Sequence, residues 1–323
     1  MKRIWPVLLL LLSTLLLRAG ELLRLEDSVD AMGTTFIAVA YGEDETELQQ
    51  AMAAAFEEAL RLDRMLSNYR PESEWSRVNR QAAAGPVKVS DELFSLLDYC
   101  AQVHRASEGT FDISVGPLMR VWGFFRGSGR LPPLAELSQA REKVGFANVV
   151  LDRAARTVRF LKPGVELDPG GIGKGYAVDR MIERLKAHGI KSAMISAGAS
   201  SIYGLGAPPG DTGWTVKIRH PRRYTQTVAE VKLKDGSLST SGDYEKFFEA
   251  GGKIYSHIMD PRTGYPAAGV LSVSVMAPRT LDSEAWTKPF FILGRQWAVK
   301  NKPEGMRVFL CEDEEKPSCA WLP

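Results

Sequence analysis

The chain has 323 residues, of which 45% are hydrophobic and 25% are charged, a composition typical of a folded globular protein. Its 41 basic and 39 acidic side chains nearly cancel, and no segment concentrates lysine and arginine among aromatic residues. These features argue against disorder, and against nucleic acid as a partner, because a phosphate backbone is bound through a concentrated positive field.

The first twenty residues differ from this average. Lys2 and Arg3 precede an apolar run over residues 4–17 that is broken only by two hydroxyl residues. This run is shorter than the roughly 20 residues of a membrane-spanning helix, so we expect a secretory signal over 1–20 and export to the periplasm or to the outer face of the inner membrane. The residues before Gly20 make a poor cleavage site, and membrane association through an uncleaved N-terminal anchor stays an alternative.

The three cysteines fit an exported protein. Cys311 and Cys319 lie eight residues apart and could close a small disulfide in an oxidising compartment. Cys100 shares the apolar face of a predicted helix with leucines, so we expect a buried thiol.

The rest of the chain alternates between strand and helix patterns. We expect helices over 45–66, from an N-cap at Ser90 to about 107, over 134–144, and over 284–299. Strands are predicted over 34–42, 157–161, 165–167, 192–196, 214–219, 227–233, 253–259, 270–276 and 306–311. Without repeats or long linkers, these elements indicate one continuous α+β domain, which we place over residues 27–318.

A glycine-rich turn over residues 167–176 is the most informative segment. It joins a strand pattern to a helix pattern, a geometry that directs free amide groups and the positive helix end at an anion. Lys174 adds a mobile charge to this turn. A Walker A loop is excluded, because Asp168 stands where the first glycine belongs and Gly175 follows the lysine. The alternative is a purely structural turn with a surface lysine.

Polar motifs at the ends of other predicted elements accompany this turn. In order along the chain they are Met-Gly-Thr at 32–34, Ser-x-Tyr at 67–69, Gly-x-Phe-Asp at 109–112, Asp-x-Gly-Gly-Ile-x-Lys-Gly-Tyr-Ala-Val-Asp at 168–179, Ser-Gly-Asp-Tyr at 241–244 and His-Ile-x-Asp-Pro-x-Thr-Gly at 257–264. With these motifs the chain resembles the ApbE family, the FAD:protein FMN transferases. The resemblance spans residues 32 to about 294.

The resemblance implies a T-fold-like, two-lobed, β-rich domain that binds FAD and Mg²⁺ between its lobes. It also implies transfer of FMN from FAD to a threonine or serine of an acceptor flavoprotein subunit, with release of AMP. Two other functions stay open: an FAD pyrophosphatase, in which water replaces the acceptor, and a non-catalytic exported flavin-binding protein.

The site residues follow from the same resemblance. The catalytic set is Lys174, Asp243 and His257, with His257 as the base that takes the hydroxyl proton; its alternative role is that of a hydrogen-bonded residue at a strand end. The residues assigned to the flavin nucleotide are Met32, Tyr69, Asp112, Asp168, Gly171, Lys174 and His257.

Two departures from the family pattern concern charge. The resemblance places magnesium at the Gly173 carbonyl and at an Asp-x-x-x-Thr motif, which here falls on Glu284 and Lys288. An ammonium has no lone pair for a metal, so either Lys288 takes over part of the charge on the pyrophosphate or it pairs with Glu284 along a helix face. Another register uses Asp282 or Ser283 with Thr287. The second departure is the segment 196–200, which ends in serine where relatives usually end in aspartate.

Overall fold

The computed structural model describes residues 22–314 and 318–323. The expected signal or anchor over 1–20 lies outside the described residues. Within the described ranges, none of the helices has the length and apolar character required to span a bilayer.

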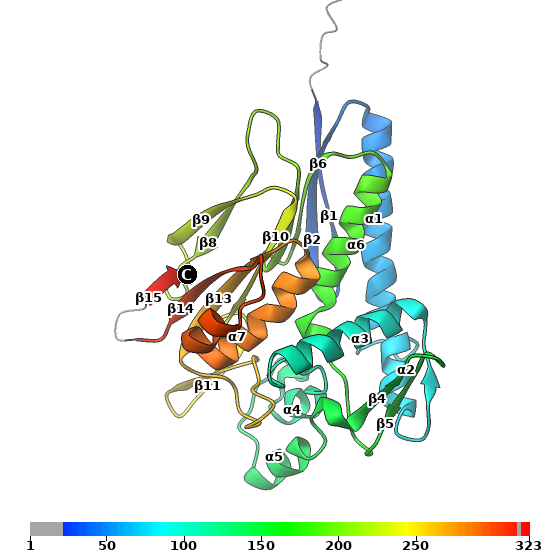
Figure 1. Cartoon of the computed structure of the whole chain (residues 1–323), viewed down its shortest axis with the longest axis vertical. Coiled ribbons are helices and arrows are strands. Elements are labelled where there is room, and N and C mark those ends of the chain that lie inside the picture. Colours follow the sequence, from blue (N-terminus) through cyan, green and yellow to red (C-terminus); the bar gives the residue numbers. More distant parts are fainter. Residues whose placement is uncertain (1–21, 315–317) are drawn as a thin grey trace, which may run out of the picture.

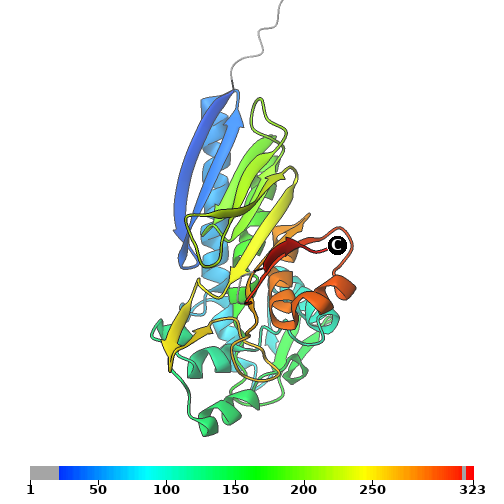
Figure 2. The same cartoon turned by 90° about the vertical axis from the view of Figure 1, so that its left-hand side faces the viewer.

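A large antiparallel sheet forms the centre of the molecule, and Figure 2 shows β1 and β2 (blue) at one edge and the C-terminal strands (dark red) near the other. Every neighbouring pair in it is antiparallel. In spatial order its eight strands are β1 (Leu23–Ala31), β2 (Thr34–Gly42), β6 (Ser192–Ala197), β7 (Ser201–Leu205), β10 (Gly236–Gly242), β13 (Val270–Ala277), β14 (Arg307–Glu312) and β15 (Ser318–Trp321).

Three long helices cover this sheet: α1 (Glu45–Leu66), α6 (Gly173–Ala187) and α7 (Thr280–Asn301). Helices α1 and α6 run side by side, and α7 packs over β10 and β13 (Figure 1). Their apolar stripes are buried, as in α6, where Val178, Met181, Ile182 and Leu185 face the core. Helix α7 also packs against α6, so the first turns of these two helices lie close together.

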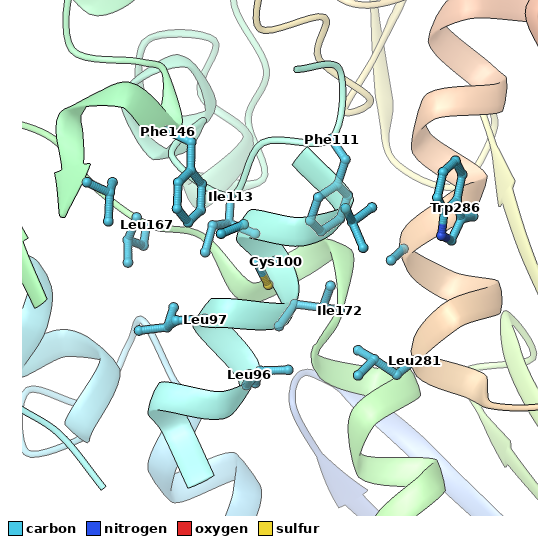
Figure 3. Close-up of a cluster of buried hydrophobic side chains, with 14 of the residues drawn as sticks. Leu96, Leu97, Cys100, Phe111, Ile113, Phe146, Leu167, Ile172, Leu281 and Trp286 are labelled. Atoms are coloured by element: carbon cyan, nitrogen blue, oxygen red, sulfur yellow. The ribbon is translucent and has the colours of Figure 1, made fainter. Parts of the chain in front are cut away.

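A smaller group of elements lies beyond one end of this sheet (Figure 1). It contains α2 (Glu74–Gln81), α3 (Asp91–Ala106), α4 (Gly116–Val121), α5 (Leu134–Arg141), and a sheet of β3 (Val87–Lys88), β5 (Thr157–Phe160) and β4 (Val149–Asp152). One apolar core joins this group to α7 and includes Cys100, Phe111, Ile172 and Trp286 (Figure 3). The glycine turn is held at the junction because Ile172 is fully buried in this core.

Two hairpins complete the fold: β8 (Trp214–Arg219) with β9 (Thr227–Leu233), and β11 (Phe247–Ala250) with β12 (Lys253–Ser256). The second hairpin packs Phe248 and Tyr255 against Trp122, which follows α4. This contact fixes the position of His257, the next residue after β12.

The α+β class is confirmed, as are the long helix 45–66, the Ser90 N-cap, the Cys311–Cys319 disulfide and the buried Cys100. Three expectations were wrong. The strand predicted over 165–167 is only an isolated bridge between Val115 and Glu166, the strand predicted to reach 259 ends at Ser256, and the helix expected from 284 begins at Thr280. The main sheet runs from Leu23 to Trp321, past both expected domain limits.

Candidate functional site

The glycine turn is a short 3₁₀ turn, Pro169–Gly171, that leads directly into α6. Asp168 caps it: its carboxylate accepts a hydrogen bond from the Gly170 amide at 2.9 Å, and its own amide donates to the Ile113 carbonyl at 2.6 Å. Burial raises the pKa of Asp168. The turn thus holds the positive end of a 15-residue helix in a fixed place.

Helix α7 is locked against the first turns of α6. The Glu284 carboxylate accepts the Gly175 amide, and Asp179 accepts the amides of Thr280 and Leu281 at 2.7 and 2.9 Å. A Cβ on Gly175 would lie 2.5 Å from the Thr280 carbonyl oxygen, so only glycine permits this approach. The contact brings the inner face of α7 to the glycine turn.

Two ammonium groups lie at this junction. The Lys174 Nζ donates to the Ser200 hydroxyl at 2.6 Å, and the Lys288 Nζ donates to the Glu284 backbone carbonyl at 3.0 Å. The Lys288 side chain passes over the turn, since its Cε lies 3.5 Å from the position of a Cβ on Gly171. Burial lowers the pKa of Lys288, and the Lys174 charge lowers it further, whereas the Glu284 charge opposes this shift.

His257 faces the same two lysines. Its backbone amide donates to the Lys246 carbonyl at 2.9 Å, and its Nδ1 lies 3.2 Å from the same oxygen. Because a carbonyl only accepts, this contact places the proton on Nδ1 and leaves the lone pair on Nε2. Burial lowers the pKa of His257 to about 3, and the charges of Lys288, Lys246 and Lys174 act in the same direction. The imidazole is therefore neutral at neutral pH.

The structure thus brings the glycine turn and the histidine segment to one cluster of charges. Met32 and Tyr69 border this cluster. Met32 has a positive φ of 52°, and its Sδ lies 3.9 Å from the position of a Cβ on Gly173. Tyr69 is 74% exposed and stands edge-on to Phe125 at 6.4 Å between ring centroids. Partial desolvation by neighbouring atoms and the Asp168 charge raise the pKa of its hydroxyl. An exposed aromatic ring beside an anion site suits stacking on a flat heterocycle.

Asp112 is placed differently. Its carboxylate accepts from the Ser114 amide, the Ser114 hydroxyl and the Phe146 amide at 2.8, 2.6 and 3.0 Å, and lies 3.4 Å from the His104 ring. It is 7% exposed, and burial raises its pKa. These contacts make Asp112 the organiser of a loop rather than a group free to bind a nucleotide.

Asp243 also points away from the lysines. Arg222 binds both oxygens of its carboxylate, with hydrogen bonds of 3.0 and 2.7 Å, and so pairs the Asp243 charge with the guanidinium. Burial raises the pKa of Asp243, and the Arg222 charge opposes this shift. Two residues further on, Glu245 instead lies among the charges of Lys174 and Lys288. The sequence motif marked the right loop but not the residue that faces the cluster.

Ser200, Glu245 and Lys246 belong to the cluster and were not predicted as site residues. Ser200 lies in the segment recognised as a departure from the family, and the other two directly follow the Ser-Gly-Asp-Tyr motif. All three residues are far from Lys174 along the chain. The only feature of the sequence that could have identified them as site residues is that they lie in or next to recognised motifs.

At the expected magnesium site the protein engages one carboxylate oxygen, Oε2 of Glu284, and an ammonium replaces the hydroxyl implied at position 288. The Glu284 carboxylate holds the Gly175 amide, and Gly173 is the first residue of α6, where the helical pattern directs its carbonyl to the amide of residue 177. Lys288 supplies donors only. Over the described residues, no group of three or more acidic, histidine or cysteine side chains could hold a metal ion.

The other register fits no better. The Thr287 hydroxyl is bonded to Ser241 at 2.8 Å and to the Glu284 carbonyl at 2.7 Å, on the side of α7 that faces the sheet. The Asp282 carboxylate is held by Arg279 and by the hydroxyl of Tyr99. Ser283 is bonded to the hydroxyls of two serines of β10. The residues present therefore do not fit the hard, oxygen-only shell of Mg²⁺ in either register.

The fold and this cluster define an α+β protein in which two ammoniums and a histidine gather where a glycine turn enters a helix. The ApbE family model matches residues 32–310. Relatives named FAD:protein FMN transferase include one from Treponema pallidum, 34% identical over 77% of this chain and 72% of its own length, and one from Salmonella typhimurium, 32% identical over 80% and 76%. The chain belongs to the ApbE family.

Solved structures agree with this assignment. The ApbE protein of Thermotoga maritima superposes with a TM-score of 0.85 at 29% identity, covering 92% of this chain and 97% of that one. The flavinyl transferase ApbE of Pseudomonas stutzeri, in its apo form, gives 0.82 at 27% identity, covering 93% and 95%. The mixed fold with a large antiparallel sheet is therefore that of ApbE proteins.

Proposed function

We propose that this chain is an FAD:protein FMN transferase, with FAD as its substrate and a protein hydroxyl as its acceptor. The observation that carries the proposal is the meeting of three features at one place, in a member of this family. These are the amide-rich end of α6, the ammoniums of Lys174 and Lys288, and the neutral imidazole of His257.

The reaction needs little covalent help from the protein. The acceptor oxygen attacks the phosphorus on the FMN side of the pyrophosphate, a new P–O bond forms, and the bond to the bridging oxygen breaks. AMP leaves with the electron pair of that bond, and the hydroxyl proton passes to Nε2 of His257. Amides of the glycine turn and the two ammoniums offset the charge that develops on the phosphate oxygens.

The flavin ring belongs on the side of Met32 and Tyr69. Two features support this: the exposed Tyr69 ring and the contact of Met32 with the start of α6. In this proposal FAD lies between the large sheet with its helices and the smaller group around α3, which is the two-lobed, T-fold-like arrangement implied by the resemblance. Mg²⁺ takes part in no step, because the donor set of this chain does not fit it.

The protein acts outside the cytoplasm in this proposal. The support is the basic and apolar N-terminal segment together with the Cys311–Cys319 disulfide, which joins β14 to β15. The acceptor is then an exported flavoprotein subunit with a threonine or serine flavinylation motif. The N-terminal segment is the part that would keep the protein at the membrane.

The test is incubation of the protein with FAD and a peptide that carries a flavinylation motif, followed by measurement of AMP and peptide mass. Transfer predicts one AMP for each peptide that gains the mass of FMN. AMP without a modified peptide would mean hydrolysis, and FAD binding without either product would mean a binding protein. His257→Gln should slow transfer by about 10² to 10⁴, whereas His188→Gln, at an exposed histidine after α6, should not change it.

A further inference from the structure

The contacts of Lys288 determine whether its positive charge is available to a bound pyrophosphate. The sequence left two roles for Lys288: a charge directed at the pyrophosphate, or an ion pair with Glu284 along one face of α7. In the structure the Glu284 carboxylate turns to the Gly175 amide, and the Lys288 ammonium donates to the backbone carbonyl of Glu284. The ion pair is not formed, so the Lys288 charge remains available to a ligand.

Lys288 is aimed at the place where an anion would bind. Its side chain lies against Gly171 in the glycine turn, with its Cε 3.5 Å from the Cβ position. Lys174, in the first turn of α6 directly after the glycine turn, donates to the neutral hydroxyl of Ser200. Both ammoniums are thus held by neutral oxygens rather than by carboxylates. Lys174 belongs to the motif over 168–179 that the resemblance rests on, so the charge that is particular to this chain is the single positive charge of Lys288.

The residue at position 200 changes the charge of the site in the direction opposite to the loss of the metal ion. The resemblance implies an aspartate at the end of the segment 196–200, and the structure puts the serine found there 2.6 Å from the Lys174 ammonium. Exchange of a divalent cation for one ammonium removes a positive charge, and exchange of an aspartate for serine removes a negative one. The two departures therefore leave the net charge around the phosphates unchanged.

We infer that Lys288, beside the Lys174 that belongs to the shared motif, takes the place of the divalent metal ion, so that this chain binds the FAD pyrophosphate and transfers FMN without Mg²⁺. This inference rests on the proposed function and adds its cofactor requirement. Lys288 acts as a substrate-binding cation: it contacts the phosphate oxygens, and no bond to it is made or broken.

The experiment compares FAD binding and AMP release in excess EDTA and in excess Mg²⁺. FAD binding is followed by quenching of flavin fluorescence, which is independent of turnover. The inference predicts for the unaltered protein that the Kd for FAD and the rate of AMP release agree within about twofold between the two conditions. Binding or AMP release that disappears in EDTA and returns with Mg²⁺ would overturn the inference and leave the proposed function intact.

Variants separate charge from structure. Lys288→Met keeps the aliphatic stem and Lys288→Thr adds a hydroxyl; each should weaken FAD binding in EDTA by about tenfold to a hundredfold, the worth of a charge-assisted contact. Only Lys288→Thr should regain affinity with Mg²⁺. Lys300→Thr, at an exposed position of the same helix, should change nothing. FAD binding in neither condition by the unaltered protein would overturn both the proposed function and the inference.

Discussion

The carboxylate of Glu284 in α7 accepts the backbone amide of Gly175 in the first turn of α6. Together with the hydrogen bonds from the Thr280 and Leu281 amides to Asp179, this contact joins the two helices that carry Lys174 and Lys288. The close approach of α7 explains why residue 175 is a glycine. The positions of the Lys174 and Lys288 ammoniums therefore depend on the close approach of the α6 and α7 backbones.

Gly175→Ala should disrupt that approach. The added Cβ would lie 2.5 Å from the Thr280 carbonyl oxygen and 2.8 Å from the Glu284 carboxylate, and a backbone atom cannot move aside cheaply. We expect a loss of about 3 kcal/mol in the free energy of unfolding, measured by urea denaturation, together with weaker FAD binding. Gly85→Ala is the matched control, because nothing lies within 4 Å of its Cβ position. Equal stability of the two variants would refute the packing argument.

His257 predicts an unusual pH profile. Its pKa is lowered from 6.5 to about 3, so the imidazole of the free protein is already neutral well below neutral pH. Since kcat/KM reports the free enzyme, it should show no loss from histidine protonation between about pH 5 and pH 7. A histidine near its ordinary pKa of about 6.5 would instead lose most activity over that interval. Observation of such a limb, absent in His257→Gln, would contradict the assignment.

The size of the His257 effect is a separate prediction. General-base catalysis contributes about 10² to 10⁴ in rate, so His257→Gln should lower kcat by that factor. FAD affinity should change little, because the neutral ring adds no charge to the pyrophosphate site. A fall in affinity with kcat preserved would mean that His257 only binds. The measurements are AMP release under saturating FAD and the Kd from flavin fluorescence.

Glu58 predicts acid sensitivity of the fold. Its buried carboxylate in α1 is bound by Arg61 at 2.7 Å and by Arg184 of α6 at 3.1 Å, and hydrogen bonds from Arg61 are the main cause that lowers its pKa from 4.5 to about 2. A lowered pKa means that the charged form stabilises the folded state above pH 4.5. That contribution is lost as the pH falls toward about 2.

The test compares Glu58→Gln with Glu57→Gln, its exposed neighbour on the same helix. At neutral pH we expect Glu58→Gln to cost about 1 to 2 kcal/mol in the free energy of unfolding, a value reduced by solvent screening of the arginines. The difference between Glu58→Gln and the unaltered protein should shrink below about pH 4. A constant difference across the range would show that packing, not charge, is responsible.

Ser200 allows a test of the charge on Lys174. Ser200→Asp should pair directly with the ammonium that now binds the hydroxyl at 2.6 Å. We expect FAD binding to weaken about tenfold, because the ligand then competes with a carboxylate for the same charge. Ser200→Ala removes the hydrogen bond and keeps the charge, so its effect should be much smaller. Equal effects of both substitutions would mean that Lys174 does not face the nucleotide.

The sequence predicts those elements whose N-caps and apolar periodicity lie within the element itself. Helix α1 begins and ends where the sequence places it, since Asp44 caps its N-terminus and its apolar residues recur at helical spacing. Strand β1 is absent from the strands predicted from the sequence, because it is an edge strand whose side chains are mostly exposed, and this removes the alternation that marks a strand. Pairing with β2, not its own pattern, makes it a strand.

The motifs predict which segments form the site, but they do not predict which side chains of each segment face it. Asp243 and Glu245 lie two residues apart in one loop, yet the first binds Arg222 and the second lies among the lysine charges. The same limit applies to residues 287 and 288: Thr287 faces Ser241 in the sheet, and Lys288 faces the glycine turn. The rotation of a helix or loop about its own axis depends on contacts with distant segments, which the sequence does not display.

The most direct test of the account is a crystal structure of the protein with FAD, grown in EDTA. We expect the pyrophosphate oxygens within about 3 Å of amides in the glycine turn and of the Lys174 and Lys288 ammoniums, with the flavin on Tyr69 and Nε2 of His257 facing the FMN-side phosphorus. A pyrophosphate bound away from the glycine turn, or with both ammoniums turned from it, would contradict the central claim that these groups form one dinucleotide site.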